Sequence, residues 1–361
     1  MDILYPYAPH YRLGVFRKLM IDPRVEYRIF AGTSALTETI LLIDPADFPF
    51  SALARNYWWR SILVQPYTVW HAMTTNAEAV IHVGDARFAM TWLAAPILRL
   101  RGKRVFYWTI GWHRPETGWK RVGRILFYRL ANKLLLYGET AREIGKSQGY
   151  PADRMAVIGN SHDVNLDSEN SSDDDPPWFP PARSEIIGAV VRPNKNKRLD
   201  LLIAAAATLG SRGRPVHVCI IGEGPQRDQL QAYARSLNVA ATLPGACHDP
   251  AVLKRFYERL AVTVVPEAAG LTVIQSLWHG RPVVTSADAY SQMPEFEAVK
   301  PGVTGSLYLP GDVEQLCAAI EYWLDQVKKH SSAVENNCRA EAAEWSAARH
   351  AERITQAVLE S

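Results

Sequence analysis

Residues 261–285 have the sequence AVTVVPEAAGLTVIQSLWHGRPVVT. The β-branched run at residues 262–265 predicts a buried strand, and residues 271–279 predict a helix that ends at Gly280. A second buried strand is expected to start at Val283, since valine dominates the sequence after the glycine and proline. One short segment therefore predicts a strand, a glycine-containing loop, a helix and a further strand, which is the repeating unit of an α/β fold.

The loop between the first strand and the helix has the features of an anion-binding site. The backbone N–H groups of Gly270, Leu271 and Thr272 are expected at the helix N-terminus, where free donors and the helix dipole favour a phosphate group. Glu267 would lie beside the bound group, and Gln275, eight positions later on the helix, could reach a second part of the same ligand. An ordinary strand, loop and helix with a capping glutamate is the alternative.

This stretch resembles the Glu-x7-Glu signature of retaining glycosyltransferases of family 4. Their fold, GT-B, is an α/β fold of two Rossmann-like domains that face a central cleft. Under the resemblance, Glu267 matches the glutamate that contacts the donor sugar near the reacting centre. Gln275 stands where the family has a glutamate that binds the ribose hydroxyls. Glutamine keeps an acceptor oxygen but loses the charge, so we expect weaker nucleotide binding and not inactivity.

A basic segment resembles another part of the same family. Residues 185–191 predict a short strand, which is followed by the sequence RPNKNKR. At this junction the family has an arginine and, five residues on, a lysine that hold the donor diphosphate, and Arg192 and Lys197 have this spacing. A cation about 4 Å from the phosphate would contribute roughly 4 kcal/mol at an effective dielectric constant of 20. Lys195 and Arg198 are expected to belong to a solvated basic turn.

Residues 216–224 predict a strand that ends in a Gly-x-Gly turn at Gly222 and Gly224. Arg227 stands where the dinucleotide-binding fingerprint requires a third glycine, so that fingerprint is excluded. In the family this turn closes against the nucleotide side of the cleft. The two glycines are therefore either nucleotide contacts or tight-turn glycines without a ligand.

The N-terminal half predicts a second α/β unit that, by the resemblance, would hold the acceptor. Residues 9–16 resemble the family's opening loop, where Gly14 would permit close approach to the donor phosphates. Residues 106–113 resemble a strand end at which relatives place a histidine on the donor sugar. Ile110 occupies that position here, so His113 would serve instead, unless it is a structural loop residue. The predicted strands of this half are residues 3–5, 26–30, 79–82, 105–108, 133–136 and 155–158.

Length and composition predict a two-domain protein without a membrane span, because 361 residues are 48% hydrophobic and no apolar run is long enough. A Ser-, Asp- and Pro-rich segment has the composition of a linker. The aspartates at 173–175 lie in that segment, so they do not predict a metal site, and the four widely spaced cysteines indicate reduced thiols. The predicted divisions are an N-terminal domain at 1–164, a linker at 165–183, a C-terminal domain at 184–339 and a returning helix at 340–361.

Positive charge is concentrated in the N-terminal half. Residues 50–135 contain 13 lysines and arginines against three acidic residues, an excess of ten, whereas the whole chain has a net charge of +3. These cations alternate with aromatic residues at 55–60 and 119–129, a pattern suited to an anionic membrane surface. Nucleic acid is the alternative partner, but no nucleic-acid motif accompanies the pattern, so none is expected. A solvated helix face is the third interpretation.

The resemblance implies a retaining hexosyltransferase that moves a sugar from a nucleotide diphosphate sugar to a glycan or lipid-linked acceptor, in polysaccharide or glycolipid biosynthesis. No cofactor and no metal are expected. The start of the chain predicts a strand and not a secretory signal, so the expected location is the cytoplasm, with peripheral attachment at the inner face of the cell membrane as an option. Two alternatives remain: a nucleotide-sugar epimerase of the same fold, and a non-catalytic glycan- or membrane-binding relative.

Overall fold

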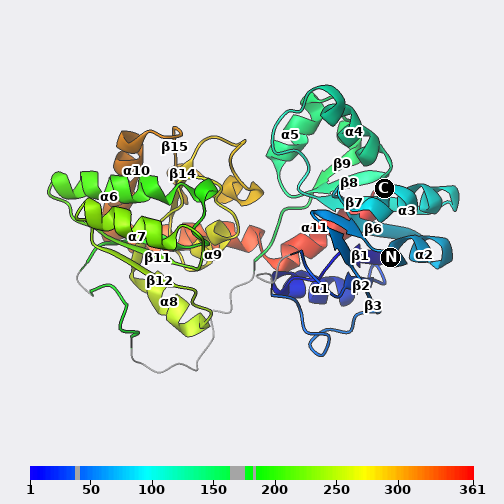
Figure 1. Ribbon diagram of the computed structural model, residues 1–361, viewed down its shortest axis with the longest axis horizontal. Helices are drawn as coiled ribbons and strands as arrows, with labels where there is room; N and C mark the ends of the chain where they lie inside the picture. The colour runs from blue at the N-terminus through cyan, green and yellow to red at the C-terminus, as the bar shows by residue number, and fades with distance from the viewer. Residues whose placement is uncertain (37–40, 163–174, 182–183) are drawn as a thin grey trace. The chain divides into compact units, whose positions relative to one another are not determined.

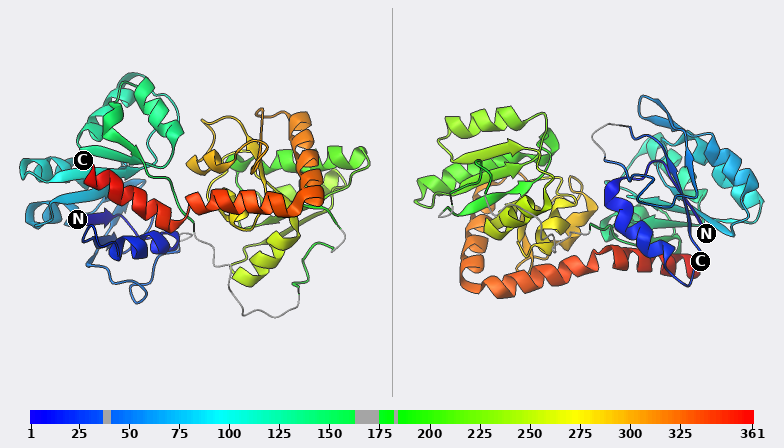
Figure 2. Two further views of the ribbon diagram at one scale, coloured as in Figure 1. Left: turned by 180° about the vertical axis from the view of Figure 1, so that it is seen from behind. Right: turned by 90° about the horizontal axis from the view of Figure 1, so that it is seen from below.

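A computed structural model of the chain describes residues 1–36, 41–162, 175–181 and 184–361 (Figure 1). The chain divides into two compact units. The N-terminal unit contains residues 1–162 together with 346–361, and the C-terminal unit contains residues 163–345 (Figure 2). Most of the predicted linker, including Asp173 and Asp174, lies outside the described residues.

The N-terminal unit is built on a parallel sheet of seven strands in the order β3-β2-β1-β6-β7-β8-β9. β1 lies between β2 and β6, so the direction of winding reverses between β1 and β6. All the strands predicted in this half are present, although the second one is shifted towards its C-terminal end. The strands are β1 (Asp2–Tyr5), β2 (Arg28–Gly32), β3 (Ala52–Ala54), β6 (Ala79–Val83), β7 (Arg104–Thr109), β8 (Lys133–Leu136) and β9 (Met155–Val157).

Alternate side chains of these strands enter two separate hydrophobic cores. Ile3 belongs to the core shared with α1 and α11, whereas Leu4 belongs to the core on the side of α2, α3, α4 and α5. A small antiparallel hairpin, β4 (Tyr57–Trp59) and β5 (Ile62–Val64), was not predicted. The helices are η1 (His10–Arg12), α1 (Leu13–Met20), α2 (Tyr67–Thr74), α3 (Ala89–Leu100), α4 (Gly118–Arg129), α5 (Glu139–Ser147), η2 (Ala152–Arg154) and α11 (Ala347–Leu359).

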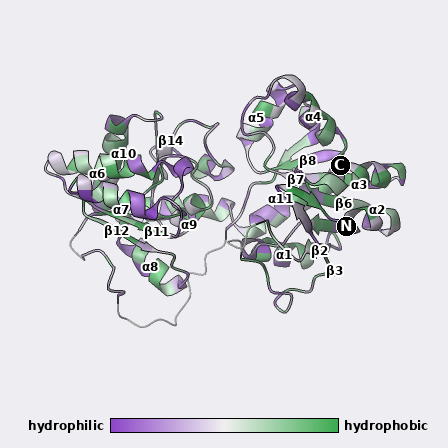
Figure 3. Cartoon of the chain, viewed as in Figure 1, coloured by the Kyte–Doolittle hydropathy of each residue, from purple (hydrophilic) through white to green (hydrophobic). Residues whose placement is uncertain are grey.

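The C-terminal unit is built on a parallel sheet of six strands in the order β12-β11-β10-β13-β14-β15. Its central strands are almost entirely hydrophobic, as expected for a parallel sheet that is covered on both faces (Figure 3). The strands are β10 (Ile186–Val190), β11 (His217–Ile221), β12 (Ala241–Gly245), β13 (Leu260–Val264), β14 (Val283–Ser286) and β15 (Gly305–Tyr308). The helices are η3 (Lys195–Lys197), α6 (Leu199–Ser211), α7 (Arg227–Ser236), α8 (Pro250–Arg259), α9 (Thr272–Trp278), η4 (Pro294–Ala298) and α10 (Val313–Glu344).

The last helix begins later than the sequence predicted. Residues 340–344 are the end of α10, and α11 starts only at Ala347, so the predicted boundary at residue 340 was wrong. The reason is a local capping signal, because the side chain of Ser346 accepts a hydrogen bond from the N–H of Arg349 at 3.3 Å. α11 packs in the N-terminal unit, where the Thr355 hydroxyl lies 2.9 Å from that of Tyr27.

A buried carboxylate joins the start of β1 to two neighbouring elements. Asp2 is fully buried, and its Oδ1 accepts a hydrogen bond from Arg28 Nε at 2.7 Å. Its Oδ2 accepts one from Thr75 Oγ1 at 2.6 Å and lies 2.8 Å from His71 Nε2. Burial raises the pKa of Asp2, but the bonds from His71, Arg28 and Thr75 outweigh it and lower that pKa to about 2.

We predict that Asp2→Asn lowers the free energy of unfolding at neutral pH by about 2–3 kcal/mol, because the native pKa lies below the unfolded value of about 3.9. A depressed native pKa stabilises the protein above the unfolded pKa, and this stabilisation is lost as the pH falls through the native pKa. The difference between the two proteins should therefore shrink between pH of about 4 and about 2. Urea denaturation over this pH range measures it, with the exposed Asp153→Asn as control; equal stabilities at neutral pH would contradict the prediction.

Candidate functional site

Two loops of the C-terminal unit meet where the strand order of its sheet reverses. β10 and β13 are neighbours, and each is followed at its carboxyl end by a loop, residues 191–198 after β10 and residues 265–271 after β13. In open α/β sheets this reversal point is the usual position of a ligand site. The two segments that were predicted to bind phosphate therefore lie at the same edge of the sheet.

The loop after β13 presents backbone donors next to a short helix. α9 has seven residues and no side-chain cap at its N-terminus. Within the described part of the chain, the N–H groups of Gly270, Leu271 and Thr272 donate to no protein acceptor, whereas the N–H of Ala269 donates to Gln292 Oε1 at 2.8 Å. Gln275 lies half-buried on α9. The three predicted donors are thus uncommitted among the described residues.

Lys197 ties the two loops together. Its ammonium group donates a hydrogen bond to the carbonyl of Ala268, and its own carbonyl accepts one from the N–H of Glu267 at 3.2 Å. Ala268 adopts a left-handed backbone conformation with φ of 51°, which is costly for a residue other than glycine. An ammonium group has three donors, so the bond to Ala268 leaves two for another acceptor.

Two arginines lie in the same loop as Lys197. Arg192 is exposed at the end of β10. Arg198, which was assigned to a solvated turn, has a side chain that is 41% exposed, and its guanidinium group lies 3.9 Å from the carboxylate of Glu267 and 3.1 Å from that of Asp200. Sequence spacing could not indicate this pairing, because it depends on the left-handed conformation of Arg198 with φ of 49°. Arg198 therefore belongs to the candidate site.

Gly222 and Gly224 allow the loop after β11 to approach the loop after β10. A Cβ atom on Gly222 would lie 2.1 Å from the carbonyl oxygen of Val191, and one on Gly224 would lie 2.3 Å from that of Pro193. Gly222 also has φ of 151°, which side chains rarely adopt. These contacts account for both glycines by packing, and they fix the backbone on either side of Arg192.

Glu295 was missed by the sequence analysis. It lies on η4, is 2% exposed, and its Oε2 atom is 3.9 Å from the position that a Cβ on Gly270 would take. Burial lowers the pKa of the Lys197 ammonium group, and the negative charge of Glu295 opposes that effect. The Pro-Glu pair after β14 indicates a helix start that carries a carboxylate. The local sequence does not indicate that this carboxylate lies near the loop after β13.

The predicted residues of the N-terminal unit lie on two different elements. Gly14 is the second residue of α1, and His113 is exposed in the loop between β7 and α4. Partial burial lowers the pKa of His113, and the charges of Arg124 and Arg114 lower it further. These positions alone assign no ligand contact to Gly14 or His113, so the roles of both residues stay predictions.

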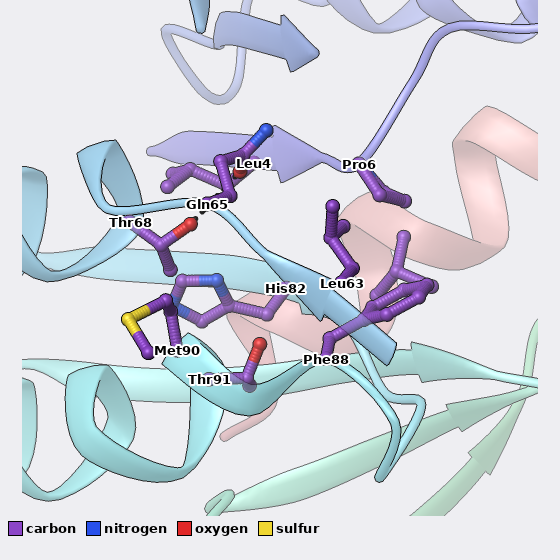
Figure 4. A pocket seen from close by; sticks show the side chains of 10 residues that line it. Leu4, Pro6, Leu63, Gln65, Thr68, His82, Phe88, Met90 and Thr91 are labelled. Atoms are coloured by element: carbon purple, nitrogen blue, oxygen red, sulfur yellow. Dashed lines mark hydrogen bonds between the residues drawn. The ribbon is translucent and has the colours of Figure 1, made fainter. Parts of the chain in front are cut away.

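A small cavity lies at the reversal point of the N-terminal sheet, between β1 and β6 (Figure 4). It has a volume of about 20 Å³, which is room for about one water molecule. His82 lies at its wall, and its Nε2 atom is buried without a partner among the described residues. Burial lowers the pKa of His82 to about 3, so its ring is neutral and can bond one hydroxyl or water. The remaining lining residues are Leu4, Pro6, Leu63, Gln65, Thr68, Val83, Phe88, Met90 and Thr91.

The described residues contain no group of three or more histidine, cysteine or acidic side chains placed to hold a metal ion. Asp175, the described member of the acidic triplet, forms ion pairs with Arg255 and Arg259. The four cysteines are free thiols. Among the described helices, none combines the length and the apolar character of a membrane span.

Solved structures with the same fold cover nearly the whole chain. The Anabaena protein HepE in complex with UDP matches all of both chains with a TM-score of 0.73 at 16% identity. A glycosyltransferase from Rickettsia africae matches 98% of this chain and 97% of its own with a TM-score of 0.70 at 14% identity. An apo lipopolysaccharide outer core galactosyltransferase, WaaB, matches 99% of both chains with a TM-score of 0.69 at 15% identity. The fold is GT-B.

A family model matches a segment that lies within the C-terminal unit of this GT-B chain. Residues 171–340 match the family model of glycosyl transferases group 1. The alpha-D-kanosaminyltransferase of Streptomyces kanamyceticus is 27% identical over 166 residues, which are 45% of this chain and 42% of that protein. The match therefore spans less than half of the curated relative. The residues matched by the family model include both loops of the candidate site.

We predict that Glu295→Gln lowers the pKa of Lys197, because removal of the carboxylate leaves the effect of burial unopposed. The titration of Lys197 can be followed by NMR after ¹³C-methylation of lysines, with its signal assigned from Lys197→Arg. Glu297→Gln on the same 3-10 helix is the matched control. An unchanged Lys197 titration in Glu295→Gln would remove Glu295 from the site.

Proposed function

We propose that this protein is a retaining glycosyltransferase resembling family 4, with a nucleotide diphosphate sugar as donor. The observation that carries the proposal is the junction of the two loops at the reversal point of the matched unit, where Lys197, Glu267 and three uncommitted backbone donors lie at one edge of the sheet. Cations and N–H groups of this kind suit a diphosphate. Glu267, half-buried and next to the junction, suits a sugar hydroxyl.

In the proposed reaction, the bond between the sugar C1 and the diphosphate oxygen breaks while the acceptor hydroxyl oxygen bonds to C1 on the same face. The acceptor proton passes to the departing diphosphate. The leaving group gains negative charge in the transition state, so positioned donors accelerate this step. Arg192, Lys197 and the N–H groups of Gly270 to Thr272 would hold the diphosphate, and Glu267 would orient the sugar. His113 remains a candidate contact of the sugar.

We expect the nucleotide part of the donor to be uridine diphosphate, because HepE has been solved with UDP and with UDP-glucose. Gln275 would contact the ribose with a neutral amide, and so more weakly than a glutamate would. We expect no cofactor and no metal requirement, since cations and backbone donors of the chain would meet the charge of the diphosphate. The acceptor would be a glycan or a lipid-linked saccharide, and the protein would act in the cytoplasm at the inner face of the membrane.

The proposal is tested by the effect of nucleoside diphosphates and their sugars on thermal stability. A ligand that binds only the native state at a hundredfold excess over its Kd stabilises it by about 2.7 kcal/mol. We expect uridine diphosphate and a UDP-sugar to raise the melting temperature, and a sugar product to form once the acceptor is supplied. Release of free nucleotide without any acceptor product would favour the epimerase, and absence of nucleotide binding would favour the non-catalytic relative.

Lys197→Ala should lower turnover by at least about tenfold, which is roughly 1.4 kcal/mol of transition-state stabilisation. Lys195→Ala is the matched control, because Lys195 lies on the same 3-10 helix but is exposed. Both variants should be assayed with saturating donor in the presence of EDTA, and their melting temperatures compared. Equal turnover of the two variants would exclude Lys197 from the reaction.

Gln275→Glu should preserve or tighten donor binding, whereas Gln275→Ala should weaken it by about 1 kcal/mol if the side chain bonds the ribose. Calorimetric titration of the parent and both variants with uridine diphosphate measures this. The same affinity in all three proteins would place the ribose elsewhere than beside α9.

A further inference from the structure

Two helices of the N-terminal unit expose hydrophobic side chains where a solvated helix would carry polar ones. On α4, Trp119, Val122 and Leu126 are exposed at helical spacing, and Trp119 is 81% exposed. On α3, Leu93 and Leu100 are seven residues apart and therefore lie on the same face of the helix. Both are exposed, Leu100 by 89%. Each helix therefore has an outward apolar stripe in addition to the face that it buries against the sheet.

The two stripes lie on helices that contact each other at two places. The ring of Trp92 on α3 lies 4.8 Å from that of Phe127 on α4. Near the ends of the same helices, Arg99 Nη1 donates a hydrogen bond to the carbonyl of Arg129 at 3.0 Å. We call this surface, the exposed side chains of α3 and α4, the α3–α4 face.

The helices of the α3–α4 face carry positive charge that is neutralised only in part among the described residues. Together α3 and α4 contain no acidic residue and five basic ones, which are Arg99, Lys120, Arg121, Arg124 and Arg129. Glu116 is paired with Arg124 at 2.7 Å, so Arg124 is not available to a partner. Lys120 and Arg129 are exposed, and within the described residues neither side chain makes an ion pair or a hydrogen bond.

We infer that the α3–α4 face docks on an anionic lipid bilayer, with the stripe side chains entering the interface and the flanking cations contacting lipid phosphates. This inference rests on the proposed function only in that a bilayer would bring a lipid-linked acceptor to the N-terminal unit. Apolar side chains interleaved with cations match an interfacial amphipathic surface. A nucleic-acid surface would need stacking or base-contacting groups, and the stripes are largely aliphatic.

The two kinds of side chain predict different responses to salt. Attraction of cations to an anionic leaflet fades as the Debye length falls from about 10 Å at about 0.1 M salt to about 3 Å at about 1 M. Insertion of apolar side chains does not fade in this way. Each cation near the surface changes membrane affinity by up to about fivefold, so removal of two should weaken binding by up to about 25-fold at low salt.

The experiment is sedimentation of the whole protein with vesicles of phosphatidylcholine, with or without phosphatidylglycerol, at low and high salt. Lys120→Ser with Arg129→Ser should reduce pelleting with anionic vesicles mainly at low salt. Trp119→Ser with Leu126→Ser should reduce it at both salt concentrations. The matched control is Lys328→Ser with Lys329→Ser, two exposed lysines on α10, and it should pellet like the parent protein.

Because the altered side chains are exposed, every variant should fold, and thermal unfolding measures this. Stabilisation by uridine diphosphate, measured without vesicles, reports on the donor site separately, so loss of docking and failure of the proposed function are distinguishable. Equal pelleting with neutral and anionic vesicles, unchanged pelleting of both double variants, or no pelleting at any salt overturns the inference. Binding of a DNA or RNA oligonucleotide in place of vesicles overturns it in favour of nucleic acid.

Discussion

A parallel sheet that is wound in two directions from a central strand leaves a crevice beside that strand, and this constraint sets the position of the candidate sites. In the C-terminal unit the reversal lies between β10 and β13, and the loops that follow these strands carry Lys197 and Glu267. In the N-terminal unit it lies between β1 and β6, where the cavity beside His82 opens. The helices on the two faces of each sheet pack into the hydrophobic cores. This packing holds the strands, and the loops that follow them, in place.

The charges at the reversal point of the C-terminal unit are balanced within the chain. Arg198 faces Glu267, and the charge of Glu295 acts on Lys197. Burial favours the neutral form of the Lys197 ammonium group and lowers its pKa, whereas the nearby charge of Glu295 favours the charged form. The same arrangement leaves the N–H groups of the loop after β13 as donors whose charge state cannot change with pH.

Local sequence was sufficient for most of the elements, although it missed β3 and the β4–β5 hairpin. The alternation of β-branched strands, glycine loops and helices predicted the α/β fold, which is confirmed, and residues 261–285 form the predicted strand, loop, helix and strand. The pairing of Arg198 with Glu267, the approach of Glu295 to Gly270 and the neutralisation of Arg124 by Glu116 were not predictable. Each depends on a tertiary contact or on a left-handed backbone residue, and neither leaves a periodic signal in the sequence.

The return of α11 to the N-terminal unit makes that unit discontinuous in the chain. During synthesis, residues 346–361 leave the ribosome only after all of the C-terminal unit. The core shared by α1 and α11 therefore stays open until then, although every other element of the N-terminal unit has already been made. Domains made in one piece can fold as they emerge, whereas the core of this unit is complete only once α11 has been made. The order of synthesis and the order of completion of the two units are thus opposite.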